Sequence, residues 1–595
     1  VALNLAPTTP QWLRNLGASP MKLGLDLSGG VHFLLEVDMD AAVKKTLDKY
    51  VGEIRRDLSN NQIRYGSVAV VNGSVLIQLR DEATADQVVN QLKKDLPKLQ
   101  AEDLNLHYRV ENQNTGAAPY FREAIRQQVL SAIKELNQDR PEDQQLNLYT
   151  SGLRIYTSID SRMQKYAEEP VQEHMRAEQK LFYDHWRGRN PWVNEEMKEI
   201  KGFLKDAMKR TQRYRDLMTA YNNDEFKVWE ELRRPIKMTV FTWVGDKDTT
   251  LSPMDSLNYY KRILNCGMMA MDPMNGHVKA WIGGINYKYF KFDHISQSKR
   301  QPGSTFKPFV YGAAIENEIV TPCDELVDEP VTFGEEDGLS GGTWTPQNSD
   351  GKYSYQNMKM RRAMGLSINS ISAKLMKQLG PDKIAEFAHK CGIESPLHEV
   401  PSLCLGASEV SLFEQVSGYS TLANGGEKID PILVLRITDK VGNVLREYSP
   451  PVKAAIKPET AYLMTYMLQG AVQEPGGTAE GLKRTSIVAG NEIGAKTGTT
   501  SNYSDGWFMG VTQKLVAGVW VGGDDRSIHF RSLALGQGAK MAMPAYAKFM
   551  EKVYADQTLA IEGYRKMPFI KPENFAFDFS CNGRVAVDST ATIAP

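Results

Sequence analysis

The first residues whose spacing suggests chemistry are Ser304 and Lys307, in the run Ser-Thr-Phe-Lys. On a helix that starts at Ser304, a three-residue step brings the lysine amine alongside the serine hydroxyl. A serine hydroxyl is a weak nucleophile at neutral pH, and a lysine removes its proton only when burial or nearby positive charge lowers the lysine pKa. The pair predicts a serine nucleophile with a lysine base, although an isolated S-x-x-K pattern recurs by chance in long chains.

A second motif, Ser367-Ile368-Asn369, follows a helical pattern. A hydroxyl at Ser367 could relay a proton between Lys307 and a leaving amine. The Asn369 amide could bind both a substrate carbonyl and Lys307. An S-x-N pattern by itself carries no information, so these roles depend on the other motifs.

The third motif, Lys496-Thr497-Gly498-Thr499, lies at the end of a predicted strand. Gly498 lacks a Cβ, so a substrate backbone could lie beside this strand as an added β-strand. Lys496 would supply positive charge that lowers the pKa of Lys307 and attracts a carboxylate. Thr499 could hydrogen-bond that carboxylate and contribute its backbone N–H to an oxyanion hole.

The order S-x-x-K, S-x-N and K-T-G is a signature of penicillin-binding proteins and class A β-lactamases. The flanks are more specific, and residues 300–309, 344–348 and 476–479 resemble the transpeptidase half of class A penicillin-binding proteins. Residues 153–160 resemble the strand and turn that open that half, and the resemblance covers about residues 120–565. It implies catalytic roles for Ser304, Lys307, Ser367, Asn369 and Lys496, and substrate-binding roles for Thr497, Gly498, Thr499 and Trp344.

The resemblance implies a D,D-transpeptidase that cross-links peptidoglycan stem peptides through an acyl-enzyme on Ser304 and needs no cofactor. The donor would be a D-Ala-D-Ala stem, the acceptor an amine of a neighbouring stem, and β-lactams would act as inhibitors. The expected location is the periplasm or cell envelope. This sequence contains no apolar stretch long enough to cross a membrane, so an inner-membrane anchor is expected in the parent protein. The acidic motif of the family's glycosyltransferase domain is not found in the sequence.

Two other functions stay open. A D,D-carboxypeptidase or serine β-lactamase would direct the acyl group to water, but no base that could activate this water is identified. A non-enzymatic module of protein translocation is the alternative from another class, and it depends on the N-terminal residues.

The elements that must position the motifs predict a multidomain α/β and α+β protein. Its catalytic part is predicted to be a penicillin-binding or serine β-lactamase-like domain with a central antiparallel sheet and flanking helices. Leu515–Val521 is nearly continuous in apolar residues, as in a buried central strand. The strands are expected at residues 268–271, 277–282, 492–499 and 506–522, and the helices at 305–316, 358–378 and 381–391.

The first 110 residues have the pattern βαββαβ, which predicts a ferredoxin-like module. Residues 20–33 resemble the signature that opens the first periplasmic domain of SecD, a subunit of the bacterial protein translocase. Asp40 can cap a helix, and Asn72-Gly73 suits a tight hairpin turn. The strands are expected at residues 31–37, 63–71, 74–80 and 104–110, and the helices over residues 40–58 and 88–96.

These patterns divide the chain into a SecD-like module, a linker with a helical segment, a transpeptidase domain and a tail. Because two unrelated families meet in one chain, we hypothesise an artificial or assembly-derived fusion. The predicted boundaries are 1–110, 111–150, 151–570 with a charged helical insertion at 161–235, and 571–595.

The composition is that of an ordinary globular protein, with 42% hydrophobic and 24% charged residues and a net charge of -1. This balance gives no indication of a nucleic-acid partner. The cysteines are odd in number, widely spaced and without a C-x-x-C pair, which predicts neither a disulfide framework nor a metal site. They are Cys266, Cys323, Cys391, Cys404 and Cys581.

Overall fold

The computed structural model describes residues 39–60, 63, 65–71, 74–79, 85, 88–89, 116–339, 341–500, 502–573 and 575–581. These residues belong to two compact units, one within Phe33–Gly116 and one that continues from Ala117. Within the described ranges, no helix has the length and apolar character needed to cross a membrane.

The first unit contains a helix, α2 (Met39–Asn60), and a hairpin of β1 (Tyr65–Val71) and β2 (Ser74–Leu79). The helix predicted after Asp40 and the two strands are therefore confirmed. The strands predicted at 31–37 and 104–110 and most of the second helix lie outside the described residues, so the complete ferredoxin-like pattern stays a prediction. A small core joins the elements, with Val51, Leu58, Val68 and Val88 all buried.

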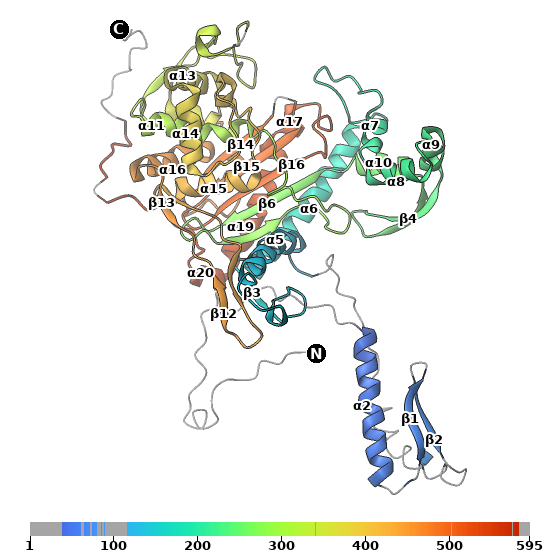
Figure 1. Ribbon diagram of the computed structural model, residues 1–595. Helices are drawn as coiled ribbons and strands as arrows, with labels where there is room; N and C mark the ends of the chain where they lie inside the picture. Colours follow the sequence, from blue (N-terminus) through green and yellow to red (C-terminus); the bar gives the residue numbers. More distant parts are fainter. Residues whose placement is uncertain are drawn as a thin grey trace, which may run out of the picture. The chain divides into compact units, whose positions relative to one another are not determined.

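The second unit is a mixed α/β structure whose strands and helices carry the predicted motifs (Figure 1). Its main sheet is formed by β14 (Gly494–Thr499), β15 (Asp505–Val511), β16 (Val516–Gly522), β6 (Asn265–Met271) and β7 (Val278–Ile282), in that order and all antiparallel. The smaller strands are β3 (Arg154–Thr157), β4 (Ile236–Val240), β5 (Lys247–Leu251), β8 (Glu325–Val327), β9 (Asn357–Lys359), β10 (Glu427–Ile429), β11 (Val434–Thr438), β12 (Val444–Glu447) and β13 (Val452–Ala454).

The helices of this unit cover both faces of the main sheet. The longer ones are α5 (Pro119–Leu136), α6 (Ser161–His185), α10 (Pro253–Tyr260), α11 (Lys307–Glu316), α13 (Asn369–Leu379), α14 (Pro381–Cys391), α15 (Leu412–Ala423), α16 (Pro458–Gln473) and α19 (Met543–Ala555). The shorter ones are α7 (Phe203–Lys209), α8 (Gln212–Ala220), α9 (Glu225–Arg233), α12 (Met360–Leu366), α17 (Leu533–Gly536), α18 (Gly538–Met541) and α20 (Gln557–Ile561).

Alternation along the buried strands divides the apolar side chains between two cores. Trp507 and Met509 of β15 belong to the core under α11, α15 and α16, whereas Phe508 belongs to the core under α6 and α19. Successive side chains of a strand point to opposite faces, so a strand buried on both faces is apolar throughout. The nearly continuous apolar run in β16 follows from this double burial.

Residues 161–235 are predicted to be a charged helical insertion, but the helix α6 at their start is packed differently. Met163, Ala167 and Val171 recur on one face of α6 and are fully buried against the main sheet. This helix is thus part of the central core, while α7 to α9 surround a separate small core that includes Tyr214 and Leu232.

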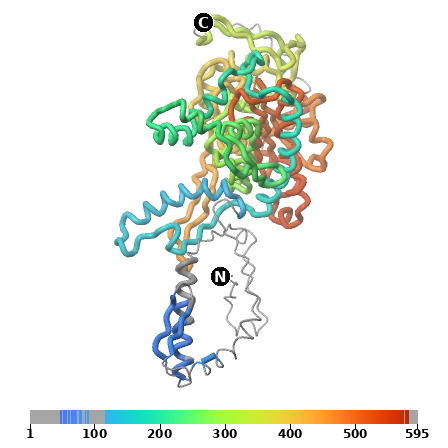
Figure 2. Tube along the Cα trace, turned by 90° about the vertical axis from the view of Figure 1, so that its right-hand side faces the viewer, coloured from blue at the N-terminus to red at the C-terminus, as the bar shows by residue number. Residues whose placement is uncertain are grey.

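Residues 153–160 include the expected strand, β3, in a small sheet of order β12-β11-β3, but the second unit already begins at Ala117, just before α5. Figure 2 shows α5 beside the β11–β12 hairpin, where Arg446 forms an ion pair with Glu135. These early residues are therefore built into the same unit as the motifs.

The prediction of one continuous helical segment over residues 358–378 is wrong. Ser367 adopts a left-handed conformation, with φ of 59° and ψ of 42°, and ends α12 before α13 begins. The short helix α12 is held closely against α16, since a Cβ at Gly365 would lie 2.7 Å from the backbone of Gly470. The break and this close packing place the Ser367 turn between α12 and α13.

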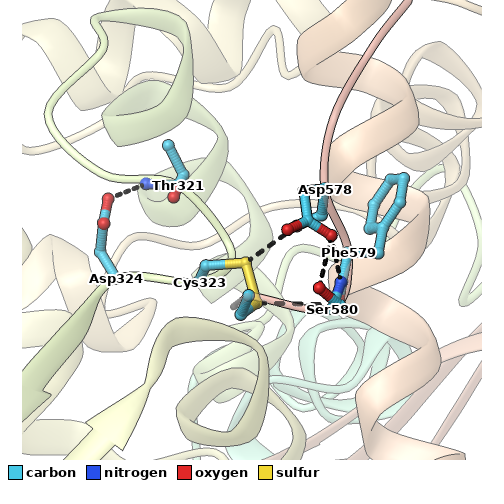
Figure 3. Close-up of a disulfide and its surroundings, with 7 residues drawn as sticks. Thr321, Cys323, Asp324, Asp578, Phe579 and Ser580 are labelled. Carbon is cyan, nitrogen blue, oxygen red and sulfur yellow. Dashed lines mark hydrogen bonds between the residues drawn. A yellow bond between two sulfur atoms is a disulfide. The ribbon is translucent and has the colours of Figure 1, made fainter. Parts of the chain in front are cut away.

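The prediction that the cysteines form no disulfide is also wrong. Cys323 and Cys581, separated by 258 residues, are bonded, with their Cα atoms 5.4 Å apart (Figure 3). Local spacing could not indicate this pair, because the C-terminal segment returns to the catalytic unit through tertiary packing. Phe579 lies 4.5 Å from Tyr466 of α16 between ring centroids, and Phe575 lies 5.7 Å from Tyr462. The other three cysteines are buried thiols.

Reduction of the Cys323–Cys581 bond is expected to lower the free energy of unfolding by about 2–5 kcal/mol, because the unfolded chain regains the freedom of a long loop. Urea unfolding with and without reductant, followed by tryptophan fluorescence, measures this loss. A Cys581→Ser variant should unfold like the reduced protein and be insensitive to reductant. Equal midpoints for oxidised and reduced wild-type protein would contradict the expectation.

Candidate active site

Ser304 lies in a tight turn at the beginning of α11. The turn is the 3-10 helix η3 (Gly303–Phe306), which continues directly into α11 at Lys307. A Cβ at Gly303 would lie 2.9 Å from the carbonyl oxygen of Thr499, and one at Gly498 would lie 2.6 Å from that of Pro302. Both glycines therefore allow the serine turn to lie directly against the end of β14.

Lys307 is fully buried, and its amine is held by the second motif. Nζ donates to the carbonyl oxygen of Ser367 and to Oδ1 of Asn369, both at 2.6 Å, and lies 3.3 Å from Oγ of Ser367. The structure thus joins the predicted base to both polar residues of the S-x-N motif.

Lys496 reaches the same serine from the opposite side. Its Nζ donates to Oγ of Ser367 at 2.8 Å and to the carbonyl oxygen of Thr497 at 3.0 Å, and its side chain is fully buried. The hydroxyl of Ser367 consequently lies between two lysine amines. The three motifs meet at this hydroxyl.

The left-handed conformation of Ser367 makes this meeting possible. In this turn both the carbonyl oxygen and the hydroxyl of Ser367 face Lys307. Positive φ is uncommon for a residue with a side chain, and such conformations cluster at functional sites.

Two buried amines without an acidic partner cannot both be charged at low cost. Among the residues that the structure describes, neither Lys307 nor Lys496 forms an ion pair. Burial lowers the pKa of Lys307 to about 7. Burial, together with the charge of Lys307, holds the pKa of Lys496 well below its ordinary value.

This result changes the predicted role of Lys496 in the unliganded site. The sequence suggests that the charge of Lys496 lowers the pKa of Lys307, but burial of Lys307 is the main cause. Repulsion between the two amines is mutual, and together with burial it holds the pKa of Lys496 below its ordinary value.

A neutral Lys307 is well arranged to accept a proton. A neutral amine has two hydrogens and one lone pair, and the two contacts at 2.6 Å use the hydrogens. The lone pair is then left for a third group. In the described part of the chain, the half-buried Ser304 has no hydrogen bond from its hydroxyl, so this hydroxyl is available to substrate and base.

Asn348 is a positioning residue to which the sequence assigns no role. Its Oδ1 accepts the backbone N–H groups of Asn369 at 2.9 Å and Ser370 at 3.2 Å, and so caps α13 from a distant loop. Its Nδ2 donates at 2.8 Å to Asp328, which also accepts from the Ser370 hydroxyl at 2.6 Å. Asn369 is further fixed by donating from Nδ2 to the carbonyl oxygen of Gln347 at 2.6 Å. The signal in the sequence is the run at residues 344–348, which resembles the family without revealing this contact.

The remaining predicted residues occupy different places. Thr499 is at the end of β14, where its Oγ1 accepts the N–H of Gly538 at 3.1 Å, and Thr497 is buried in the same strand. Trp344 stacks on Phe333 with ring centroids 5.5 Å apart. Its role in substrate binding stays a prediction.

Comparison with protein families gives three matches. Residues 266–525 match the penicillin binding protein transpeptidase domain, and residues 187–264 match the penicillin-binding protein middle domain. Residues 16–41 match the SecD/SecF GG motif.

Curated relatives match between about half and four fifths of the chain at moderate identity. Penicillin-binding protein 1A of Rickettsia felis is 27% identical over 530 residues, which are 81% of this chain and 62% of the relative. Penicillin-binding protein 2D of Bacillus subtilis is 34% identical over 290 residues, which are 48% of this chain and 41% of the relative. The chain thus spans about three fifths of the length of the first of these relatives.

Solved structures support the fold. The crystal structure of penicillin-binding protein 1A from Haemophilus influenzae has a TM-score of 0.55 and 22% identity, with coverage of 80% of this chain and 78% of that chain. PonA1 from Mycobacterium tuberculosis has a TM-score of 0.50 and 20% identity, with coverage of 80% and 99%.

The rate of acylation by a penicillin is expected to rise with pH until about pH 7 and then to level off. Protonated Lys307 cannot accept a proton, and its pKa is lowered to about 7, so the reactive fraction falls roughly tenfold per pH unit below that value. Labelling rates between pH 5 and 9 measure the profile. A Lys307→Gln variant should react far more slowly and without this inflection, whereas a flat wild-type profile would exclude Lys307 as the base.

The Asn348→Ala variant should lose at least tenfold in acylation rate and about 1–3 kcal/mol in the free energy of unfolding, because buried N–H groups at α13 lose their acceptor. Ser370→Ala is the matched control, since it removes a hydrogen bond to Asp328 and leaves the Asn369 cap intact. The control should be destabilised but acylate within about threefold of the wild-type rate. Equal losses of rate in the two variants would show that Asn348 affects stability alone.

Proposed function

We propose that the chain is a D,D-transpeptidase that forms stem-peptide cross-links through an acyl-enzyme on Ser304. The match of residues 266–525 to the penicillin binding protein transpeptidase domain supports this proposal. The observation that carries the proposal is the pair of buried lysines joined by the Ser367 hydroxyl beside the serine turn. This arrangement provides a neutral amine next to a serine without an acidic partner. Recognition of peptidoglycan and the acyl transfer are parts of the proposal.

Acylation begins when Lys307 accepts the proton of the Ser304 hydroxyl. The Ser304 oxygen then forms a bond to the carbonyl carbon of the penultimate D-Ala of a donor stem. The backbone N–H groups of Ser304 and Thr499 would stabilise the oxyanion. When the bond to the terminal D-Ala breaks, the leaving nitrogen receives a proton from Lys307 through the Ser367 hydroxyl.

The second half-reaction restores Ser304. An amine of a neighbouring stem attacks the acyl carbon and gives up a proton to Lys307 as the new amide bond forms. The bond between the acyl carbon and the Ser304 oxygen breaks, and this oxygen takes the proton from Lys307. A β-lactam mimics the donor but leaves a slowly hydrolysed acyl-enzyme.

Lys496 would act on the terminal carboxylate of the donor. A negative charge near its amine favours the protonated form, so substrate binding would restore the pKa that burial has lowered. The Thr499 hydroxyl would hydrogen-bond the same carboxylate. Lys307 would then stay neutral and act as the base, and the charged Lys496 beside it would bind the carboxylate. These are the roles that the motifs predict.

A D,D-carboxypeptidase or β-lactamase would use the same acyl-enzyme and pass it to water. Rapid turnover of a fluorescent penicillin would support these alternatives, whereas persistent labelling supports the transpeptidase. The periplasmic side of the cell envelope is the proposed location, with membrane attachment in the parent protein. The match of residues 16–41 to the SecD/SecF GG motif leaves a role in translocation as a separate hypothesis for the N-terminal part of the chain.

Ser304→Ala should abolish covalent labelling by a fluorescent penicillin and leave the unfolding transition nearly unchanged, because it removes the nucleophile but little buried area. Gel fluorescence and intact-protein mass spectrometry measure the adduct, and peptide mapping locates it. Ser296→Ala, which replaces a serine outside the three motifs, is the control and should label like the wild type. An adduct on another residue of the wild-type protein would end the assignment.

A further inference from the structure

A polar cavity lies apart from Lys307 and Lys496. It has a volume of about 490 Å³ and is bounded by the segment that follows α6, the residue Arg262 before β6, and the loop after β16. Its walls include three arginines, Arg189, Arg262 and Arg531, but only one carboxylate, that of Glu199. The lining therefore has an excess of positive charge that the reaction at Ser304 does not use.

Arg262 is fixed in this cavity by neutral partners. Its guanidinium donates to the carbonyl oxygen of Arg189 at 3.1 Å, to Oδ1 of Asn258 at 3.0 Å and to Oδ1 of Asn190. It also lies over the ring of Trp192, 5.2 Å from the centroid. The side chain is half-buried, and burial lowers its pKa.

Arg531 is fixed in a similar way on the other wall. Its Nε donates to Nε2 of His185 at 3.1 Å, another nitrogen donates to the His185 carbonyl oxygen at 2.9 Å, and the guanidinium lies 4.9 Å from the ring of Trp186. Because Nε2 accepts this hydrogen bond, His185 is neutral. Burial and the charge of Arg531 lower the pKa of His185 and favour this neutral form.

The carboxylate of Glu199 offsets the charge of these arginines only in part, since its charge raises the pKa of Arg262 against the larger effect of burial. It accepts from Nδ2 of Asn190 at 2.8 Å, and within the described residues none of the three arginines forms an ion pair. Arg189 is exposed at the rim. Guanidinium groups held on aromatic rings present planar donors that match a carboxylate or a phosphate, and a bound anion would offset the uncompensated charge.

The cavity is at the same end of the main sheet as the catalytic strand end. Thr499 pairs with Gly506, Asp505 pairs with Gly522, and Gly522 pairs with Asn265, which begins β6 just after Arg262. Three strand spacings separate β14 from β6, roughly 15 Å. A ligand in the cavity would therefore be near the reacting end of the sheet without occupying the Ser304 site.

We propose that this cavity binds an oxyanion group, a carboxylate or a phosphate, of a ligand other than the acyl donor. Arg262 and Arg531 bind the anion from two walls, and Arg189 closes the rim. A free carboxylate of a second peptide stem and a phosphate group are the two sources with this chemistry. The proposal rests on the cavity and is independent of acylation at Ser304.

Binding is tested with the full chain after acylation by benzylpenicillin, which blocks the Ser304 site. Isothermal titration with inorganic phosphate and, separately, with a stem pentapeptide that has free carboxylates distinguishes the two sources. Arg189→Glu reverses the charge of an exposed side chain at the rim, and Arg531→Gln removes the charge of a side chain in the cavity wall. Each variant is expected to raise the Kd of the binding probe at least tenfold.

Arg213→Glu is the matched control, because Arg213 is exposed on α8 outside the cavity. It should bind like the wild type, and unchanged penicillin labelling of every variant shows that the fold is retained. Saturable binding of either probe that is lost in Arg189→Glu and kept in Arg213→Glu supports the site. No saturable binding of either probe, or equal binding by both charge-reversal variants, overturns it. Failure of wild-type acylation would instead contradict the proposed function, and binding would then be measured on the unlabelled chain.

Discussion

The candidate active site depends on the burial of two lysine amines that both contact one serine hydroxyl. Lys307 and Lys496 have no exposed surface, and Ser367 Oγ lies within 3.3 Å of one amine and 2.8 Å of the other. Water would stabilise both charges, so the surrounding structure must exclude it and supply neutral acceptors instead. The glycines at 303 and 498, the left-handed Ser367 and the distant cap from Asn348 all serve this requirement. The site is thus a property of several elements that the fold brings together.

The sequence predicts which residues form this site better than it predicts the contacts between them. The order of the three motifs identifies Ser304, Lys307, Ser367, Asn369 and Lys496, since each type follows from the chemistry that it would perform. Alternation and apolar runs likewise predict most of the main sheet, but the run predicted at 506–522 is divided by a turn into β15 and β16. In the first unit, the described helix and hairpin are also predicted correctly from the sequence.

What the sequence misses depends on contacts between distant residues. The break at Ser367 is invisible to helical periodicity, which continues in both flanking helices. Asn348 contacts Asn369 across a loop, and Cys323 contacts Cys581 across 258 residues, so no local spacing encodes either pair. The main cause of the lowered pKa of Lys307 is burial, which only the folded core determines, so the motif alone does not indicate it.

The bond between Cys323 and Cys581 has a consequence for how the protein is made. A chain synthesised from its N-terminus presents Cys323 long before Cys581, so the ring can close only after the K-T-G strand and the last helices have been produced. Until then Cys323 is a free thiol that could pair with Cys266, Cys391 or Cys404. The folded structure buries those three thiols. Correct closure therefore requires that the core fold first, in a compartment that oxidises thiols.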